Sequence, residues 1–176
     1  GTPSEFTTTT YDNLDRPALV TYPDGSLDRA CYTNNEVLRA DAAGKWSKTI
    51  HDGLGRLKTV AENPTGSCQS LTNTGSGGGA GLLTTYLYTA RDLLSQVTQG
   101  GQTRTFSYDS LGRLTSAANP ESGATSYTYD SAGNLKSRSM SGRSVAMKYD
   151  LLHRLARKTY TDATNTPEVT YCYDGG

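Results

Sequence analysis

Aspartates that follow a tyrosine or a histidine recur along the chain, and they are the side chains best suited to chemistry. They include Asp12, Asp52, Asp109, Asp130 and Asp150. A carboxylate at such a position can bind a metal ion or act as a general acid. It can also cap a turn by accepting backbone N–H groups, and pair across a hairpin. Recurrence in nearly every copy of one sequence motif favours the turn-capping role.

The other reactive side chains are few. His51 and His153 occupy positions where other copies of the motif carry tyrosine and glycine, so each is explained as a substitution within the motif. Cys31 and Cys172 each precede a motif tyrosine in distant copies and are not expected to pair, whereas Cys68 can reach Cys31 only if its segment folds back. The sequence has no CxxC, no GxSxG and no phosphate-binding loop followed by lysine. We therefore expect no catalytic residue, no metal site and no cofactor.

The motif reads Tyr-Asp, two variable residues, Gly, Arg, Leu, and its copies begin at residues 11, 32, 51, 88, 108, 129, 149 and 173. The spacing is 19 to 24 residues except for 37 after residue 51, where a Gly/Ser-rich insertion at 64–84 is expected to form a long loop. Residues 1–10 are expected to be a lead-in strand or a tag remnant. Residues 11–176 then hold about seven and a half repeats, and the incomplete copy at 173–176 indicates a piece of a longer protein.

Each copy of the motif predicts a β-hairpin with a three-residue loop. Such a loop combines a type I turn with one residue in the left-handed region, usually glycine. That position is filled by Gly55, Gly112, Gly133, Asp15, Asp92 and His153. Asp and His are enriched among residues with positive φ, so a backbone requirement explains the pattern. Glu36 is the exception and is expected to be strained.

The loop geometry fixes the register, with Tyr opposite Leu and Asp opposite Arg. The expected Tyr–Leu pairs are Tyr32–Leu38, Tyr88–Leu94, Tyr108–Leu114, Tyr129–Leu135 and Tyr149–Leu155. Tyr11 holds the tyrosine position of the first copy, and Leu57 holds the leucine position of the third. The expected Asp–Arg pairs on the other face are Asp12–Arg16, Asp52–Arg56, Asp109–Arg113 and Asp150–Arg154. Apolar residues two positions before the tyrosine should share its face; they are Tyr86, Phe106, Tyr127, Met147 and Tyr171. One face should thus be rich in Tyr and Leu, and the other in Thr, Ser, Lys and Arg.

A second turn midway through each repeat gives two strands per repeat and an all-β, antiparallel meander of hairpins. About 14–16 strands spaced by roughly 4.8 Å make a sheet about 70 Å across, and open sheets beyond about ten strands curl. We therefore expect a long curved sheet. The formal net charge is +0, which gives no support for nucleic-acid binding. No apolar run approaches the roughly 20 residues of a membrane helix.

The Tyr-Asp-x-x-Gly-Arg-Leu motif, clearest in residues 108–139, resembles the YD repeat of the RHS (rearrangement hot spot) family. The resemblance implies a β-strip that spirals into a hollow shell, as in bacterial polymorphic toxins, the cocoons of insecticidal toxin complexes, and teneurins. It also implies a secreted or cell-surface bacterial protein whose partners are the rest of the shell and an enclosed C-terminal domain. Shell-closing relatives carry an Asp-Pro self-cleavage motif, and no Asp-Pro dipeptide occurs in this sequence. Neither the autoprotease nor the toxin is therefore assigned to this chain.

Two functions of different classes follow. The first is a non-catalytic segment of a shell that encapsulates or presents a C-terminal toxin or effector domain. The alternative is a carbohydrate- or protein-binding repeat module at the cell surface, with the tyrosine rows as a platform for sugar stacking. No residue supports an enzyme. Outside a shell, two unpaired edges and one apolar face would be uncovered, so we expect the isolated chain to self-associate.

Overall fold

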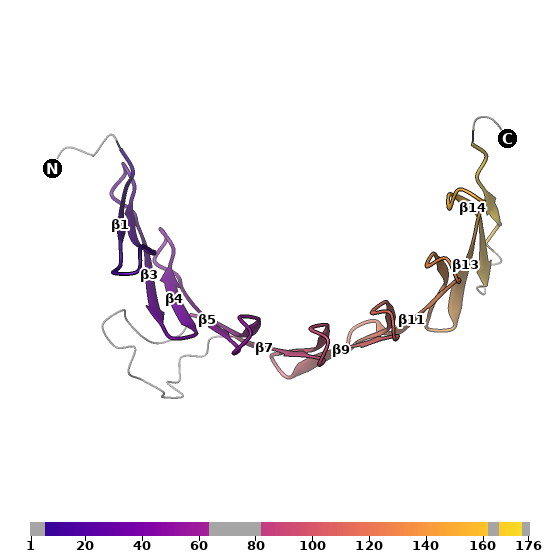
Figure 1. The fold of residues 1–176 in the computed structure, drawn as a ribbon, viewed down its shortest axis with the longest axis horizontal. Coiled ribbons are helices and arrows are strands. Elements are labelled where there is room, and N and C mark those ends of the chain that lie inside the picture. The colour runs from indigo at the N-terminus through magenta and orange to yellow at the C-terminus, as the bar shows by residue number, and fades with distance from the viewer. Residues whose placement is uncertain (1–5, 64–81, 162–165, 174–176) are drawn as a thin grey trace. The chain divides into compact units, whose positions relative to one another are not determined.

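The computed structural model describes residues 6–63, 82–161 and 166–173, and these form an all-β chain. Fifteen strands make one open sheet in which neighbours in space are neighbours in sequence, from β1 to β15 (Figure 1). The predicted antiparallel meander is therefore confirmed. The described part contains no helix long and apolar enough to cross a membrane.

The chain divides into two compact units. Unit 1 is Gly1–Leu87 with Thr98–Gly101, and unit 2 is Tyr88–Val97 with Gln102–Gly176. The first strands are β1 (Thr8–Tyr11), β2 (Pro17–Thr21), β3 (Leu27–Thr33), β4 (Glu36–Ala40), β5 (Trp46–His51), β6 (Leu57–Glu62), β7 (Leu83–Tyr88) and β8 (Leu94–Gln99). They are followed by β9 (Gln102–Tyr108), β10 (Leu114–Asn119), β11 (Gly123–Tyr129), β12 (Leu135–Met140), β13 (Arg143–Tyr149), β14 (Leu155–Thr161) and β15 (Val169–Thr170).

The motif hairpins have the predicted loop. Between β9 and β10, the N–H of Gly112 donates to the carbonyl of Asp109 at 3.0 Å, and the N–H of Asp109 donates to the carbonyl of Arg113 at 3.0 Å. Gly112 has a φ of 80°, as the bulged loop requires. Positive φ is also found at the other predicted positions, namely Asp15, Gly55, Asp92, Gly133 and His153. The sequence therefore predicted the backbone conformation of this position correctly.

Of the predicted Tyr–Leu pairs, three are confirmed and one is wrong. Tyr108 pairs with Leu114, Tyr129 with Leu135 and Tyr149 with Leu155, and His51 pairs with Leu57 at the equivalent positions. Tyr32, however, pairs with Val37 instead of Leu38. This hairpin has a two-residue turn in which Asn34 adopts a φ of 52°, so the register moves by one residue. Glu36 lies in β4 with no positive φ, and its carboxylate is 2.6 Å from Lys48 Nζ.

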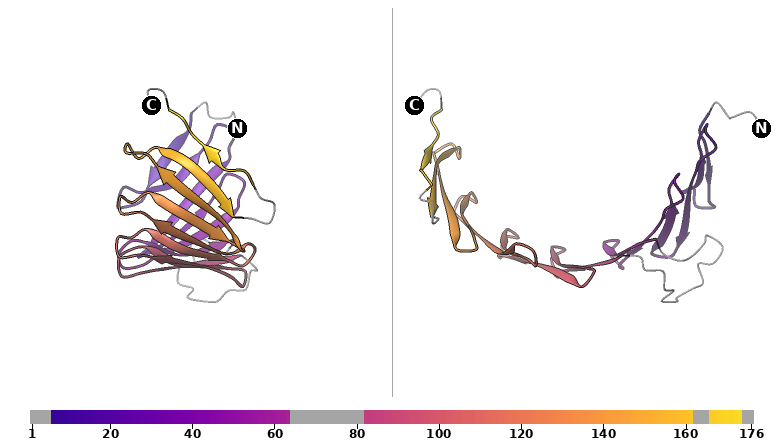
Figure 2. Two further views of the ribbon diagram at one scale, coloured as in Figure 1. Left: turned by 90° about the vertical axis from the view of Figure 1, so that its right-hand side faces the viewer. Right: turned by 180° about the vertical axis from the view of Figure 1, so that it is seen from behind.

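The sheet is one layer thick within each unit (Figure 2), and it buries little. In the described ranges, the buried hydrophobic residues are Leu38 and Ala40, and the buried polar residues are Thr84 and Thr125. None of the large side chains described is fully buried. Hydrophobic burial therefore contributes less than in a two-layer domain, and contacts between neighbouring hairpins must supply the rest.

The tyrosine-bearing face of unit 2 has the expected apolar residues and some unexpected cations. Phe106 and Met147 alternate with exposed neighbours and share the face of the motif tyrosines, as predicted. Arg138 pairs directly with Tyr127, and Lys158 with Met147, so these cations also lie on the tyrosine face. The prediction that Lys and Arg gather on the opposite face is therefore wrong at these positions. The opposite face carries an unbroken cross-strand row of hydroxyl residues: Ser107, Ser116, Ser126, Ser139, Ser144 and Thr161.

The repeat boundaries differ slightly from those expected. β1 begins at Thr8, inside the expected lead-in segment, and pairs with β2. β7 begins at Leu83, so the last two residues of the expected 64–84 insertion belong to a strand. Residues 64–81 lie outside the described ranges. Tyr173 is described, whereas the rest of the incomplete final copy is not.

The N-terminal edge strand carries no device that blocks further pairing. All four residues of β1 are exposed and uncharged, and such an edge invites pairing with another chain. We expect the protein to self-associate at tens of micromolar, and we expect Thr9→Lys on β1 to shift it toward monomer in light scattering. Thr105→Lys, on the exposed face of the interior strand β9, is the matched control. A wild-type chain that stays monomeric would contradict this expectation.

Candidate functional site: the joint between repeats

The motif aspartates cap their own hairpin loops. Asp109 Oδ1 accepts the N–H groups of Leu111 and Arg113 at 2.9 Å each, and Oδ2 accepts Arg113 Nε at 2.7 Å. The same arrangement is present in Asp12–Arg16, Asp52–Arg56 and Asp150–Arg154. All four predicted Asp–Arg pairings are therefore confirmed. The carboxylates are occupied by turn capping and ion pairing, as their recurrence predicted.

The motif tyrosines connect each hairpin to the one before it. Tyr129 in β11 donates its hydroxyl hydrogen to the carbonyl of Leu114 in the preceding hairpin, at 2.8 Å. The equivalent bonds are Tyr32 to Pro17, Tyr108 to Leu94, Tyr149 to Leu135 and Tyr173 to Leu155, at 2.8 to 3.1 Å. Each tyrosine thus spans the boundary between two repeats.

The motif arginine completes this boundary by stacking on the tyrosine of the next repeat. Arg113 Cζ lies 4.6 Å from the centre of the Tyr129 ring. The corresponding distances are 4.2 Å for Arg16 over Tyr32 and 4.4 Å for Arg154 over Tyr173, all within range of a cation–π interaction. The expectation that the Asp–Arg pair lies on the face away from the tyrosines is therefore wrong for arginine. We call the Asp and Arg of one hairpin, together with the Tyr of the next, a joint.

Among the joints that keep the motif tyrosine, two depart from this composition in different ways. In the hairpin between β7 and β8, Thr89 replaces Asp and Leu93 replaces Arg. Thr89 Oγ1 still accepts the N–H of Leu93 at 3.2 Å, so the cap survives without charge. In the hairpin between β11 and β12, Asp130 is retained, but Asn134 replaces Arg and donates Nδ2 to Asp130 Oδ2 at 3.0 Å. That joint keeps its negative charge and loses its cation.

Hydrogen bonds to the motif carboxylates lower their pKa values. The side-chain bond from Arg16 is the largest cause of the lowered pKa of Asp12. The N–H of Arg113 is the largest cause for the pKa of Asp109, and the Asn134 side chain for that of Asp130. In each case partial burial raises the pKa and is outweighed. These aspartates are therefore ionised in the folded chain, and their charge stabilises the joint.

Acid should destabilise the chain because of these lowered pKa values. The folded aspartates release protons more readily than unfolded ones, so their contribution is present above the unfolded pKa and is lost as pH falls through the folded pKa. We expect the urea midpoint to be steady between roughly pH 7 and 5 and to fall below about pH 4. Asp109→Asn, which keeps an oxygen for the loop N–H groups, should reduce this fall. A midpoint that is unchanged at lower pH would contradict the expectation.

The remaining reactive side chains do not form a chemical site. The described residues contain no cluster of three or more His, Cys, Asp or Glu able to hold a metal ion. His153 takes the left-handed loop position with a φ of 61°, and His51 takes the tyrosine position, so both substitutions fit the motif. Cys31 is disulfide-bonded and Cys172 is free and exposed; the two do not pair with each other, as predicted. Cys68 lies outside the described residues.

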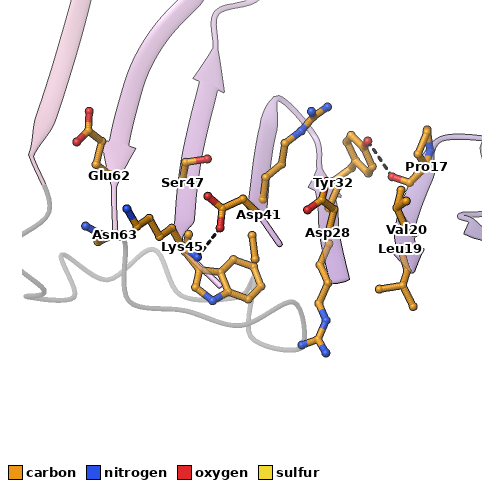
Figure 3. A pocket seen from close by; sticks show the side chains of 16 residues that line it. Pro17, Leu19, Val20, Asp28, Tyr32, Asp41, Lys45, Ser47, Glu62 and Asn63 are labelled. Carbon is orange, nitrogen blue, oxygen red and sulfur yellow. Dashed lines mark hydrogen bonds between the residues drawn. The ribbon is translucent and has the colours of Figure 1, made fainter. Parts of the chain in front are cut away.

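A hollow of about 670 Å³ is lined by residues of strands β2 to β6 and their turns in unit 1 (Figure 3). Its lining includes Ala40 and Trp46, which are register partners, and Arg39 and Ser47, which form the adjacent pair. Adjacent residues in a strand face opposite sides of the sheet, so both faces contribute to the lining. The hollow therefore borders an open single-layer sheet.

Comparison with known proteins agrees with this geometry. Residues 88–124 and 108–140 match the family RHS Repeat, and no curated protein matches the chain. The crystal structure of TcdB2-TccC3-Cdc42 is similar at 14% identity and a TM-score of 0.71, over 93% of this chain and 9% of that chain. The crystal structure of TcdB2-TccC3 (15%, 0.70) and the Photorhabdus luminescens Tc holotoxin pore (14%, 0.70) each match 92% of this chain and 9% of theirs. At this identity the likeness shows the fold, and the chain spans less than a tenth of those chains.

Proposed function

We propose, from the match of residues 88–124 and 108–140 to the family RHS Repeat, that this chain is a structural, non-catalytic segment of a β-sheet wall that encloses or presents another domain. The observation that carries the proposal is the joint. The side chains that recur most regularly, Asp, Arg and Tyr, hold successive hairpins together and are not displayed for a ligand. Such a joint can be repeated without limit, which suits a long wall.

The hairpin loops offer surfaces through which a wall can pack. The loop leucines Leu14, Leu54, Leu111 and Leu152 are 70% to 74% exposed. Exposed apolar side chains at regular intervals suit contact with another part of a larger assembly. On this proposal, the partners are neighbouring turns of the wall and the enclosed domain. The protein would act outside the cell or at its surface.

Small-angle X-ray scattering on the 176-residue chain tests the proposal. A compact globule of this length has a radius of gyration of about 16 Å, and a single-layer strip must exceed that clearly. Chromatography immediately before scattering isolates the monomer, so that self-association does not inflate the value. A monomer with a radius of gyration near 16 Å would contradict the proposal that the chain is a segment of a wall.

A glycan array followed by calorimetry distinguishes the proposed wall function from the alternative, a binding module. We expect no saturable glycan binding, because the motif tyrosines are engaged in joints. Saturable binding that is lost in Tyr127→Ala, on the tyrosine face but outside the joints, would favour the binding module.

A further inference from the structure

The joint between the β11–β12 hairpin and β13 keeps its aspartate and its tyrosine but has no arginine. Asp130 and Tyr149 occupy the positions that Asp109 and Tyr129 occupy in a complete joint, and Asn134 stands where arginine would be. The hydroxyl of Tyr149 still donates to the carbonyl of Leu135 at 3.0 Å, so the tyrosine is correctly placed. Within the described ranges, no cation lies over the Tyr149 ring.

A hollow of about 430 Å³ lies at this joint. Asp130, Asn134, Tyr149 and His153 are among the residues that line it. Asn134 Nδ2 donates to Asp130 Oδ2 at 3.0 Å and lies 3.0 Å from His153 Nδ1. Asn134 is shorter than arginine, so its amide does not extend as far as the guanidinium of a complete joint.

The neutral joint of this chain provides an internal comparison. Where arginine is replaced by Leu93, the aspartate is also replaced, by Thr89, and no carboxylate is left without a cation. At Asn134 only the cation is lost. The carboxylate of Asp130 therefore keeps an acceptor oxygen that elsewhere binds a guanidinium, beside a tyrosine ring that elsewhere is covered by one.

We propose that this hollow binds an alkylguanidinium group, such as the side chain of an arginine supplied by another molecule. The guest would donate hydrogen bonds to Asp130 Oδ2 and stack on Tyr149, as Arg16, Arg113 and Arg154 do in their joints. A guanidinium fits better than an ammonium, because its planar group can stack and donate at once. Lys136 and Lys148 also line the hollow and oppose a guest cation, so the affinity is weak, in the millimolar range. The inference rests on the joint geometry and is independent of the wall function.

Titration followed by NMR tests this site on the intact chain. N-ethylguanidinium should shift the Tyr149 ring and Asn134 side-chain amide signals along a saturable curve, whereas the neutral N-ethylurea should not. N-ethylammonium should bind at least several-fold more weakly. Acetyl-arginine amide forms a second arm: its binding identifies an arginine of a polypeptide as the source, and binding of N-ethylguanidinium alone identifies a small guanidinium ligand.

Two variants complete the test. Asn134→Arg should place the chain's own guanidinium in the hollow, abolish binding of N-ethylguanidinium and raise the midpoint temperature of unfolding. Asp130→Asn keeps an oxygen for the loop N–H groups and removes the charge, and it too should abolish binding. The proposal is overturned by shifts that do not saturate, by equal shifts with N-ethylurea or N-ethylammonium, or by binding that persists in either variant.

Discussion

Substitution of Tyr129 by alanine is expected to lower the free energy of unfolding by about 3 kcal/mol, at the low end of aromatic-to-alanine changes because the side chain is half-buried. The ring carries two contacts that join successive repeats, a hydroxyl bond to the carbonyl of Leu114 and the stacked guanidinium of Arg113. No second layer of structure compensates for their loss. Urea denaturation, with hydrogen exchange on the amides of β10 and β11, measures the effect.

Tyr129→Phe separates the two contacts. The phenylalanine ring still lies under Arg113, and the lost hydroxyl bond should cost about 1 kcal/mol. Hydrogen exchange should increase at the boundary between β10 and β11 in the alanine variant and much less in the phenylalanine variant. If the two substitutions cost the same, stacking contributes nothing and the joint reduces to a single hydrogen bond.

Sequence reasoning predicted the hairpins because their determinants are local. A motif that places Asp three residues before a glycine specifies the loop, and the loop specifies the register. The exception at Tyr32 has the same origin. Asn34 is itself well suited to positive φ, so it formed a two-residue turn in which Glu36 became an ordinary strand residue.

The joint was not predicted, because it depends on where side chains point across a repeat boundary. Strict alternation assigned arginine to the face away from tyrosine. The register irregularities beside the hairpin loops, such as that between Leu114 and Ser116, interrupt the alternation. Arg113, at the end of the loop, stacks on the ring of Tyr129.

The charged residues on the tyrosine face were missed for a related reason. Arg138 and Lys158 lie opposite Tyr127 and Met147, where a two-layer domain would exclude charge. In a single layer the face remains partly exposed, so the aliphatic stems can pack while the charged groups reach water. Binary patterning predicts which residues share a face only where a second layer makes burial complete.

Gly112→Val is expected to lower the free energy of unfolding by about 2 kcal/mol through backbone strain. Gly112 has a φ of 80°, a conformation that β-branched residues strongly disfavour. Crowding is not the cause, because an added Cβ would lie 3.7 Å from Leu93 Cδ1, an ordinary contact. Urea denaturation of the intact chain measures the loss.

Gly112→Asp is the matched control, because the chain already carries aspartate at this loop position. Asp15 and Asp92 adopt φ values of 57° and 61° in the equivalent loops, so this variant should lose less than about 1 kcal/mol. A requirement for the small size of glycine would make the two variants equally damaging. A requirement for positive φ makes valine the worse by a clear margin, and it explains why Gly, Asp and His exchange at this position.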